Sequence, residues 1–575
     1  MVSDPVRRLA ERPTIQARHY LASTGHYLAT AAATRILDAG GNATDAGVAA
    51  GICINVLMPD LTSFGGVAPI VVYDKAREEV KTISGLGTWG KDLTLDGYLE
   101  RFKGEIPPGP GRSIVPAAAD SWLTALRVYG TMSFAEVVAP AIELCERGFP
   151  VYPSLNRNIR MYRSGIEPWP STASIYLKDG DEPEIGSVLI QADLGRTFRR
   201  LVEAEERAPG SREDKILAAR EEFYQGEIAK RMADFISAEG GFLTAADLAE
   251  FSVEIETPVR TNYRGVDVLV CGPWCQGPVV AQTLNILEGF PLAQTHHNSA
   301  GYLHLMSQSL NLAFADRDAY YGDPHFVDVP METLISKEYA AAQRDRISMD
   351  RAFDGMPQGG LDLAPARLGP SPEPRTPTVP DPDTSYVCIV DRFGNAFSAT
   401  PSDGIGTSPI IPGLGLVCSG RGTQSWLDPG HPAVVQAGKR PRLTPNPAMA
   451  FKDGRLLMPF GTPGGDMQAQ AMVQSFVNIV DFGMDVQEAI EQPRVATYNF
   501  PGSGWPHAYR PGLLRLEGRI PAEIADDLTG RGHNVEYWPN WSRIAGNVCA
   551  ILVDQETGVL SGGADARAEA YAQGW

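Results

Sequence analysis

Apolar residues along the first half of the chain follow two periods in turn. They recur at helical spacing over residues 28–37, which predicts a helix that Gly40-Gly41 ends. Two β-rich runs, Ile70–Tyr73 and Val80–Ile83, flank a short polar turn, the pattern of an antiparallel hairpin. Helical spacing returns over residues 118–147, 300–319 and 467–480. The alternation predicts a mixed α/β protein.

A proline-rich segment interrupts this alternation in the second half. Eight prolines lie between residues 355 and 383, a density that excludes a helix or a central strand and is typical of an exposed domain linker. Two strand-like runs follow directly, Tyr386–Val390 and Ala396–Thr400, with Thr384-Ser385 in front of the first. The segment therefore predicts an extended linker that leads into a second hairpin.

Thr384 is a candidate nucleophile because of its place at this junction. A threonine before a strand is usually structural. If the chain were cut between Asp383 and Thr384, however, Thr384 would carry a free α-amine, whose reference pKa near 7.7–8.0 suits a general base at neutral pH. Downstream, the backbone N–H groups of Gly464-Gly465 are unshielded by side chains and are candidates for an oxyanion hole.

Composition and charge restrict the partners of the chain. Its 575 residues are 43% hydrophobic, and 50 basic against 69 acidic residues give a net charge of −19, which disfavours nucleic acid and anionic membranes as partners. The longest apolar stretch, 46–58, is too short to cross a bilayer. The polar N-terminal residues lack the apolar core of a signal peptide, so we expect a soluble, cytoplasmic protein.

Other motifs indicate no cofactor and no metal. Residues 85–90 match G-x-G-x-x-G, but the preceding strand is the second arm of a hairpin, so we interpret them as a glycine-rich turn. The nine histidines contain no HExxH, and Cys271 and Cys275 have no second pair with which to complete a zinc site. The seven cysteines are scattered and do not resemble a disulfide framework.

Several of these segments together resemble the γ-glutamyltranspeptidase family, whose members are threonine-type N-terminal-nucleophile hydrolases. The resemblance extends over nearly the whole chain. The matching segments are 39–46 (AGGNATDA), 64–66 (FGG), 241–248 (GFLTAADL), 312–318 (LAFADRD), 383–386 (DTSY), 461–465 (GTPGG) and 563–567 (GADAR).

The resemblance implies a layered αββα fold that is made as a proenzyme. Thr384 would cleave its own chain after Asp383. This would give a large subunit, 1–383, that ends in the proline-rich linker 355–383, and an intertwined small subunit, 384–575. The same hydroxyl would then carry the acyl group in turnover. The resemblance also implies that Gly464 and Gly465 bind the oxyanion, that Ser402 supports the nucleophile, and that Thr444 lies near a substrate carboxylate.

Two positions depart from the family pattern. Leu86 stands about where transpeptidases have an arginine for the substrate α-carboxylate, and Gln424 stands where they have an acidic residue for the α-amine. Without these charges an amino-acid zwitterion should bind poorly. Arg421 instead has a planar guanidinium group that can bind a carboxylate through two N–H groups, as a fork. An Arg-Gly pair here is similar to the cytoplasmic branch of the family that includes oxamate amidohydrolase-like proteins.

The sequence therefore favours an amidase that acts through an acyl-enzyme on Thr384, with a small amide, with or without a carboxylate, as substrate. Two alternatives stay open: γ-glutamyl transfer or glutathione hydrolysis, and an uncleaved scaffold or binding protein. The resemblance implies a heterodimer of the two subunits and leaves open whether the heterodimer dimerises further.

Overall fold

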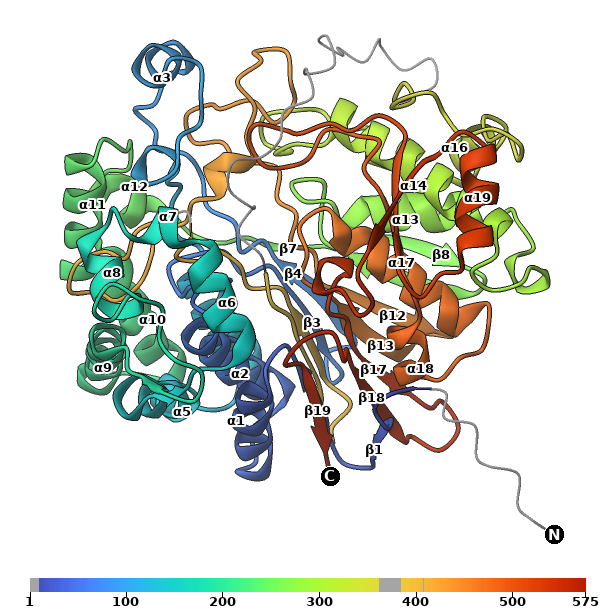
Figure 1. The fold of residues 1–575 in the computed structure, drawn as a ribbon. Coiled ribbons are helices and arrows are strands. Elements are labelled where there is room, and N and C mark those ends of the chain that lie inside the picture. The colour runs from blue at the N-terminus through green and yellow to red at the C-terminus, as the bar shows by residue number, and fades with distance from the viewer. Residues whose placement is uncertain (1–9, 361–383, 407) are drawn as a thin grey trace.

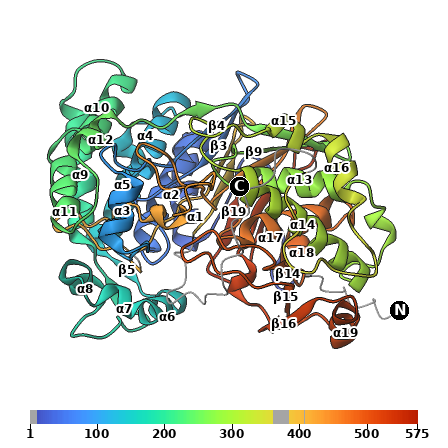
Figure 2. The same cartoon turned by 90° about the horizontal axis from the view of Figure 1, so that it is seen from above.

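The computed structural model describes residues 10–360, 384–406 and 408–575. Its elements form four layers, in which two central β-sheets lie face to face and helices cover the outer face of each (Figure 1). A view from above separates the two groups of helices, with the strands between them (Figure 2). This is the predicted αββα arrangement.

The two central sheets have seven strands each in the described part of the chain, and all of their strand pairs are antiparallel. The first sheet runs in the order β1 (Ile15–Ala17), β18 (Leu560–Ala564), β17 (Cys549–Val553), β13 (Arg455–Gly461), β12 (Ala448–Lys452), β9 (Val266–Val270) and β8 (Val259–Tyr263). The second runs β19 (Tyr571–Gly574), β2 (Leu21–Thr24), β10 (Val387–Val390), β11 (Ala396–Ala399), β3 (Ile70–Asp74), β4 (Glu79–Ile83) and β7 (Ile255–Glu256). Smaller sheets contain β14 (Val495–Thr497), β15 (Leu513–Glu517) and β16 (Asn534–Trp538), and β5 (Phe149–Pro150) with β6 (Val188–Leu189).

The helices divide between the two outer layers by their place in the chain. The group beside the second sheet comprises α1 (Tyr27–Asp38), α2 (Ala43–Leu57), α3 (Leu95–Phe102), α4 (Ala118–Tyr129), α5 (Phe134–Arg147), α6 (Pro153–Met161), α7 (Arg163–Ile166), α8 (Pro170–Tyr176), α9 (Ala192–Arg207), α10 (Arg212–Tyr224), α11 (Glu227–Ala238) and α12 (Ala245–Glu250). The group beside the first sheet comprises α13 (Gly277–Leu287), α14 (Ala300–Tyr320), α15 (Met331–Leu334), α16 (Lys337–Arg344), α17 (Met467–Val480), α18 (Val486–Glu491) and α19 (Ala522–Gly530).

Within the described residues, three large apolar cores hold the layers together. The core between the two sheets contains side chains such as Val71, Cys388, Met449 and Ile551. A second core lies between the second sheet and its helices, and a third lies between the first sheet and α13, α14 and α17. Because strand residues alternate between faces, each central sheet contributes to two cores, which explains why its strands are buried on both sides.

The predicted elements appear with small differences. The helix expected over residues 28–37 is α1, the first hairpin is β3–β4, and the second is β10–β11. The helical stretch 118–147 divides into α4 and α5, because Gly130 ends the first helix and the Ser133 hydroxyl caps the second by accepting from the Glu136 N–H. The glycines of residues 85–90 follow an antiparallel strand and open no helix, so the context of a dinucleotide fingerprint is lacking.

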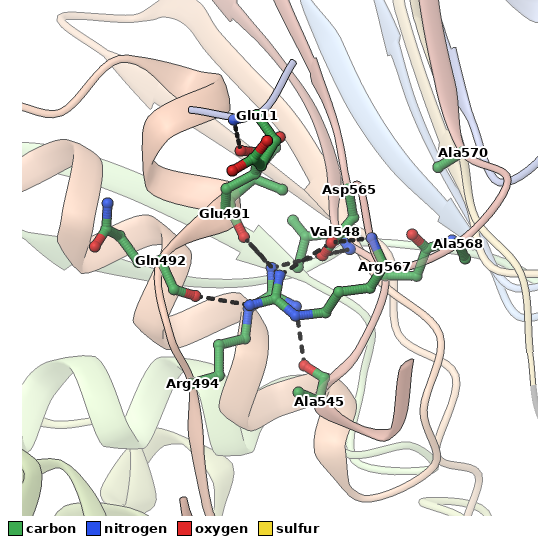
Figure 3. Close-up of polar contacts among 12 residues, drawn as sticks. Glu11, Glu491, Gln492, Arg494, Ala545, Val548, Asp565, Arg567, Ala568 and Ala570 are labelled. Atoms are coloured by element: carbon green, nitrogen blue, oxygen red, sulfur yellow. Dashed lines mark hydrogen bonds and ion pairs between the residues drawn. The ribbon is translucent and has the colours of Figure 1, made fainter. Parts of the chain in front are cut away.

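A buried ionic cluster fixes the chain near the C-terminus (Figure 3). Arg494 and Arg567 both bind the Asp565 carboxylate, at 2.7 and 3.0 Å, and Arg567 also reaches Glu517 at 2.7 Å. Burial alone would raise the pKa of Asp565, but the two guanidinium groups hold it below its usual range. The segment 563–567 that carries part of the family resemblance therefore has a structural role, since it ties β18 to α18 and β15.

This cluster yields a stability prediction. Asp565→Asn leaves two buried guanidinium groups without their shared carboxylate, so we expect the free energy of unfolding at pH 7 to fall by about 3–5 kcal/mol in urea titrations. The pKa of Asp565 is lower in the folded than in the unfolded protein. The contribution of its carboxylate to the free energy of unfolding is therefore complete above the unfolded pKa of about 3.9 and is lost as the pH falls through the folded pKa. Asp485→Asn, at an exposed helix cap, is the control and should change stability by about 0.5 kcal/mol or less. Equal effects of the two variants would contradict the cluster's role.

Candidate active site

The register of the β10–β11 hairpin places Thr384 opposite Ser402. Val387 pairs with Ala399, and continuing this register past the open end of the hairpin brings Thr384 and Ser402 together as an isolated antiparallel bridge. Their Oγ atoms are 2.9 Å apart, and both side chains are fully buried. The structure thus places the candidate nucleophile beside the hydroxyl that the family resemblance expects to support it.

Arg421 contacts groups of its own chain at this site. It begins a short 3-10 turn, Arg421–Gln424, and its Nε lies 3.2 Å from Oδ1 of Asp403. One of its Nη groups donates to Ser402 Oγ. The fork expected to receive a substrate carboxylate is therefore engaged by Asp403 and by the hydroxyl that contacts Thr384, and Arg421 has no exposed surface.

Asp403 is a functional candidate that the sequence interpretation missed. It is 1% exposed, has a φ of +85°, and accepts a hydrogen bond of 2.5 Å from Ser419 Oγ. Burial raises the pKa of Asp403, and the positive charges of Arg421 and Arg112 oppose that rise. The available signal was a polar Ser-Asp-Gly turn directly after a predicted strand, a setting in which Asp tolerates positive φ.

Gly464 and Gly465 form a turn whose N–H groups are available. Their φ angles are +126° and +55°, and +126° in particular is a conformation that side-chain-bearing residues rarely adopt. The Gly464 carbonyl accepts from Met467 N–H at 2.9 Å, and the Gly465 carbonyl accepts from Gln276 Nε2 at 2.8 Å. Within the described residues neither glycine N–H has a hydrogen-bond partner. The use of these N–H groups as an oxyanion hole stays a prediction.

A buried arginine from α14 anchors the residue that follows this turn. Arg317 contacts the Asp466 carboxylate, which also accepts from the Ser503 N–H at 2.8 Å. Arg317 further donates to the Pro501 carbonyl at 2.8 Å. The glycine turn is therefore held from one side by α14, through Asp466, and from the other by Gln276.

The expected substrate-binding residues Gln424 and Thr444 contact each other. Gln424 Nε2 donates to Thr444 Oγ1 at 3.0 Å, and Gln424 Oε1 accepts from the Thr444 N–H at 3.2 Å. Gln276 Nε2 also donates to the Thr444 carbonyl, at 3.1 Å, so the same amide joins this pair to the glycine turn. Both predicted residues therefore lie on one continuous network with the candidate oxyanion hole.

Leu86, the position where the family pattern has an arginine, is buried in the core between the sheets. It also lines a cavity of about 400 Å³ whose charged walls include Glu254, Asp323 and Arg440, and whose lining does not include Thr384. No described residue group could hold a metal through three or more His, Cys, Asp or Glu side chains. Asp383 and residues 361–382 of the proline-rich segment lie outside the described residues.

Among the described residues, no helix is both long and apolar enough to cross a membrane. The four-layer fold is that of the N-terminal-nucleophile hydrolases. The γ-glutamyltranspeptidase family model matches residues 29–575, and the chain belongs to this family.

Relatives and solved structures of the family match along the full chain. A glutathione hydrolase-like proenzyme of Bacillus subtilis strain 168 is 33% identical over 96% of this chain and 97% of its own. An acylase proenzyme of Pseudomonas strain V22 is also 33% identical, over 98% and 96%. An oxamate amidohydrolase proenzyme of Klebsiella pneumoniae is 29% identical over 97% and 98%. The crystal structure of a cephalosporin acylase from Bacillus halodurans superposes with a TM-score of 0.85 at 28% identity, covering 100% of this chain and 99% of that one.

The ion pair behind the candidate nucleophile can be tested directly. Asp403→Asn keeps the side-chain shape but removes the negative charge that lies against Arg421, so we expect it to lower the free energy of unfolding by about 3 kcal/mol or more in urea titrations. Ser419→Ala removes only one hydrogen bond to the same carboxylate and should cost about 1 kcal/mol. A loss no greater in Asp403→Asn than in Ser419→Ala would show that the charge itself is unimportant.

Proposed function

We propose that this protein is an amidase that matures by cutting its own chain and then works through an acyl-enzyme on Thr384. The observation that carries the proposal is the position of the Thr384 hydroxyl. It lies 2.9 Å from Ser402 Oγ, and Thr384 itself lies just before the first residue of β10. The available N–H groups of the Gly464-Gly465 turn support it. Membership of a family whose relatives are named as proenzymes supports the maturation step.

In maturation, Thr384 Oγ adds to the carbonyl carbon of Asp383. The C–N bond breaks, the nitrogen takes the proton lost by the hydroxyl, and an ester with a free α-amine results. Water then hydrolyses the ester, which separates residues 1–383 from residues 384–575. We propose that the two subunits stay together as a heterodimer, since β2 from the first pairs with β10 from the second inside one sheet.

In turnover, the free α-amine of Thr384 takes the hydroxyl proton while Oγ adds to the acyl carbon of the substrate amide. The N–H groups of Gly464 and Gly465 stabilise the oxyanion. The α-ammonium then protonates the leaving amine, and water, activated by the same amine, hydrolyses the ester. Every proton in this cycle passes through one group, so the chain needs no histidine at the site.

The substrate we propose is a small amide with a carboxylate close to the scissile carbonyl. Arg421 contacts Ser402, and Ser402 contacts Thr384, so a cation lies two hydrogen bonds from the nucleophile. Leu86 and Gln424 carry no charge with which to bind an amino-acid zwitterion, and the Gln424 amide is engaged by Thr444. The similarity to an oxamate amidohydrolase agrees with this class of substrate.

The alternative within the family is γ-glutamyl transfer or glutathione hydrolysis, favoured by the similarity to a glutathione hydrolase-like proenzyme. Both hypotheses use Thr384 as the nucleophile and differ only in the acyl group of the substrate. Dimerisation of the heterodimer stays a prediction.

Maturation is tested on purified full-length protein by denaturing gels and N-terminal sequencing. We expect two fragments, with Thr384 as the new N-terminus of the smaller one. Thr384→Ala should abolish cleavage and activity because no oxygen nucleophile remains, whereas Thr384→Ser should keep both at a reduced rate. A wild-type chain that stays intact after long incubation would favour an uncleaved scaffold or binding protein.

Substrate class is tested by comparing oxamate, acetamide and a γ-glutamyl anilide on matured protein. We expect oxamate to be preferred, and Arg421→Ala to lower kcat for every substrate because Ser402 loses its donor. An additional rise in KM should appear for oxamate but not for acetamide, because the charge of Arg421 attracts the carboxylate that oxamate carries beside its scissile carbonyl and that acetamide lacks. A strong preference for the γ-glutamyl anilide would support the alternative instead.

A further inference from the structure

The Gln468 side chain also lies beside the candidate nucleophile, Thr384. It is the second residue of α17, is fully buried, and its Nε2 lies 3.5 Å from Thr384 Oγ1. This separation is at the long end of the range for a hydrogen bond.

The orientation of the Gln468 amide is set by Asn446. The backbone N–H of Asn446 donates to Gln468 Oε1 at 3.3 Å. Because a backbone N–H can only donate, the oxygen of the carboxamide must face Asn446, and the NH₂ group must face Thr384. Gln468 is therefore a donor toward the nucleophilic oxygen and does not act as its base.

The backbone of the same residue holds the glycine turn. Gln468 N–H donates to the Gly465 carbonyl at 3.2 Å, which turns that peptide so that its carbonyl points toward the helix. One residue thus connects the nucleophile, through its side chain, with the candidate oxyanion hole, through its backbone.

Two hydrogen-bond donors can point at Thr384 Oγ, and they act in the step in which negative charge develops on this oxygen. Arg421 donates to Ser402 Oγ, which leaves the Ser402 hydroxyl hydrogen able to point at Thr384 Oγ from one side while Gln468 donates from another. Negative charge develops on this oxygen when the acyl ester is hydrolysed, because the C–Oγ bond breaks and its electron pair returns to Oγ. Donors aimed at developing charge in a buried site stabilise the transition state strongly.

We propose that Gln468 is a further catalytic residue, whose side-chain amide donates to Thr384 Oγ and stabilises it as the leaving group of the ester. In that step, water adds to the ester carbonyl after losing a proton to the Thr384 α-amine. The tetrahedral intermediate then expels Thr384 Oγ, which takes the proton back from the α-ammonium. The inference rests on the proposed function, since it needs an ester on Thr384.

Self-cleavage is the best assay because it requires no knowledge of the substrate. The proposed maturation passes through an ester between Asp383 and Thr384, so its breakdown uses the same leaving group. Hydroxylamine reveals this ester: its nitrogen attacks the ester carbonyl, giving an Asp383 hydroxamate and a free Thr384 hydroxyl. Time courses of cleavage, with and without hydroxylamine, therefore separate ester formation from ester breakdown.

Two variants of Gln468 remove the donor in different ways, and the chain offers a matched control. Gln468→Met removes the whole carboxamide, whereas Gln468→Glu keeps an acceptor for the Asn446 N–H and removes only the donor. Gln474 lies on the same helix, is also buried, and binds backbone groups only, donating to the Gln470 and Val495 carbonyls at 2.9 Å. Gln474→Met thus loses a comparable buried amide away from Thr384.

We expect Gln468→Met and Gln468→Glu to slow the appearance of fragments by about tenfold or more and to accumulate a hydroxylamine-sensitive ester. Gln474→Met should cleave at the wild-type rate without accumulating ester, although we expect thermal unfolding to show a lower stability because its buried hydrogen bonds are lost. The defect of Gln468→Glu should shrink relative to wild type as the pH falls, because the introduced carboxyl becomes a donor once protonated.

The possible failures are distinguishable. If wild type and Gln474→Met cleave while both Gln468 variants cleave equally fast and no ester accumulates, the role of Gln468 is wrong and the proposed function stands. If wild type itself does not cleave, the proposed function fails first. If Gln468→Met does not fold, the isosteric Gln468→Glu variant decides, through its rate and its pH dependence.

Discussion

The contact between the hydroxyls of Thr384 and Ser402 is the constraint on which the rest of the site depends. It exists because the register of the β10–β11 hairpin continues past the ends of both strands, so that a residue ahead of β10 meets a residue beyond β11. A slip of one residue would turn every side chain of the hairpin to the opposite face and separate the two hydroxyls. The apolar cores on both sides of this sheet oppose such a slip, so the packing of the sheet sets the geometry of the site.

Around that contact, two kinds of support converge from distant parts of the chain. The buried Arg421–Asp403 pair orients the Ser402 hydroxyl, and α17 brings Gln468 and the glycine turn. An ion pair of this kind adds little net stability, since desolvation offsets much of its attraction. Its value lies in orientation, because a guanidinium held by a carboxylate has few other directions in which to donate.

Much of the fold could be predicted from local pattern. The helix at residues 28–37, the two hairpins and the helix that follows Asp466 all have strong periodicity and recognisable ends, and each appears in the structure. The division of residues 118–147 into two helices depends on Gly130 and on the capping box at Ser133, and periodicity alone does not resolve it. The interpretation of Arg421 as a free fork did not foresee its contact with Asp403, because a local pattern does not report which carboxylate will lie opposite a buried cation.

By itself, the sequence determined the alternation of helices and strands, the threonine at the head of a hairpin, the paired glycines and the family that these segments resemble. Only the tertiary structure decided that Gln468 would reach Thr384, that Gln276 would join Thr444 to Gly465, and that Arg317 would anchor Asp466. The physical reason is distance along the chain. Periodicity and turn signals act over a few residues, whereas these contacts join segments brought together only when the helices pack against the two sheets and bury polar groups that must then find partners.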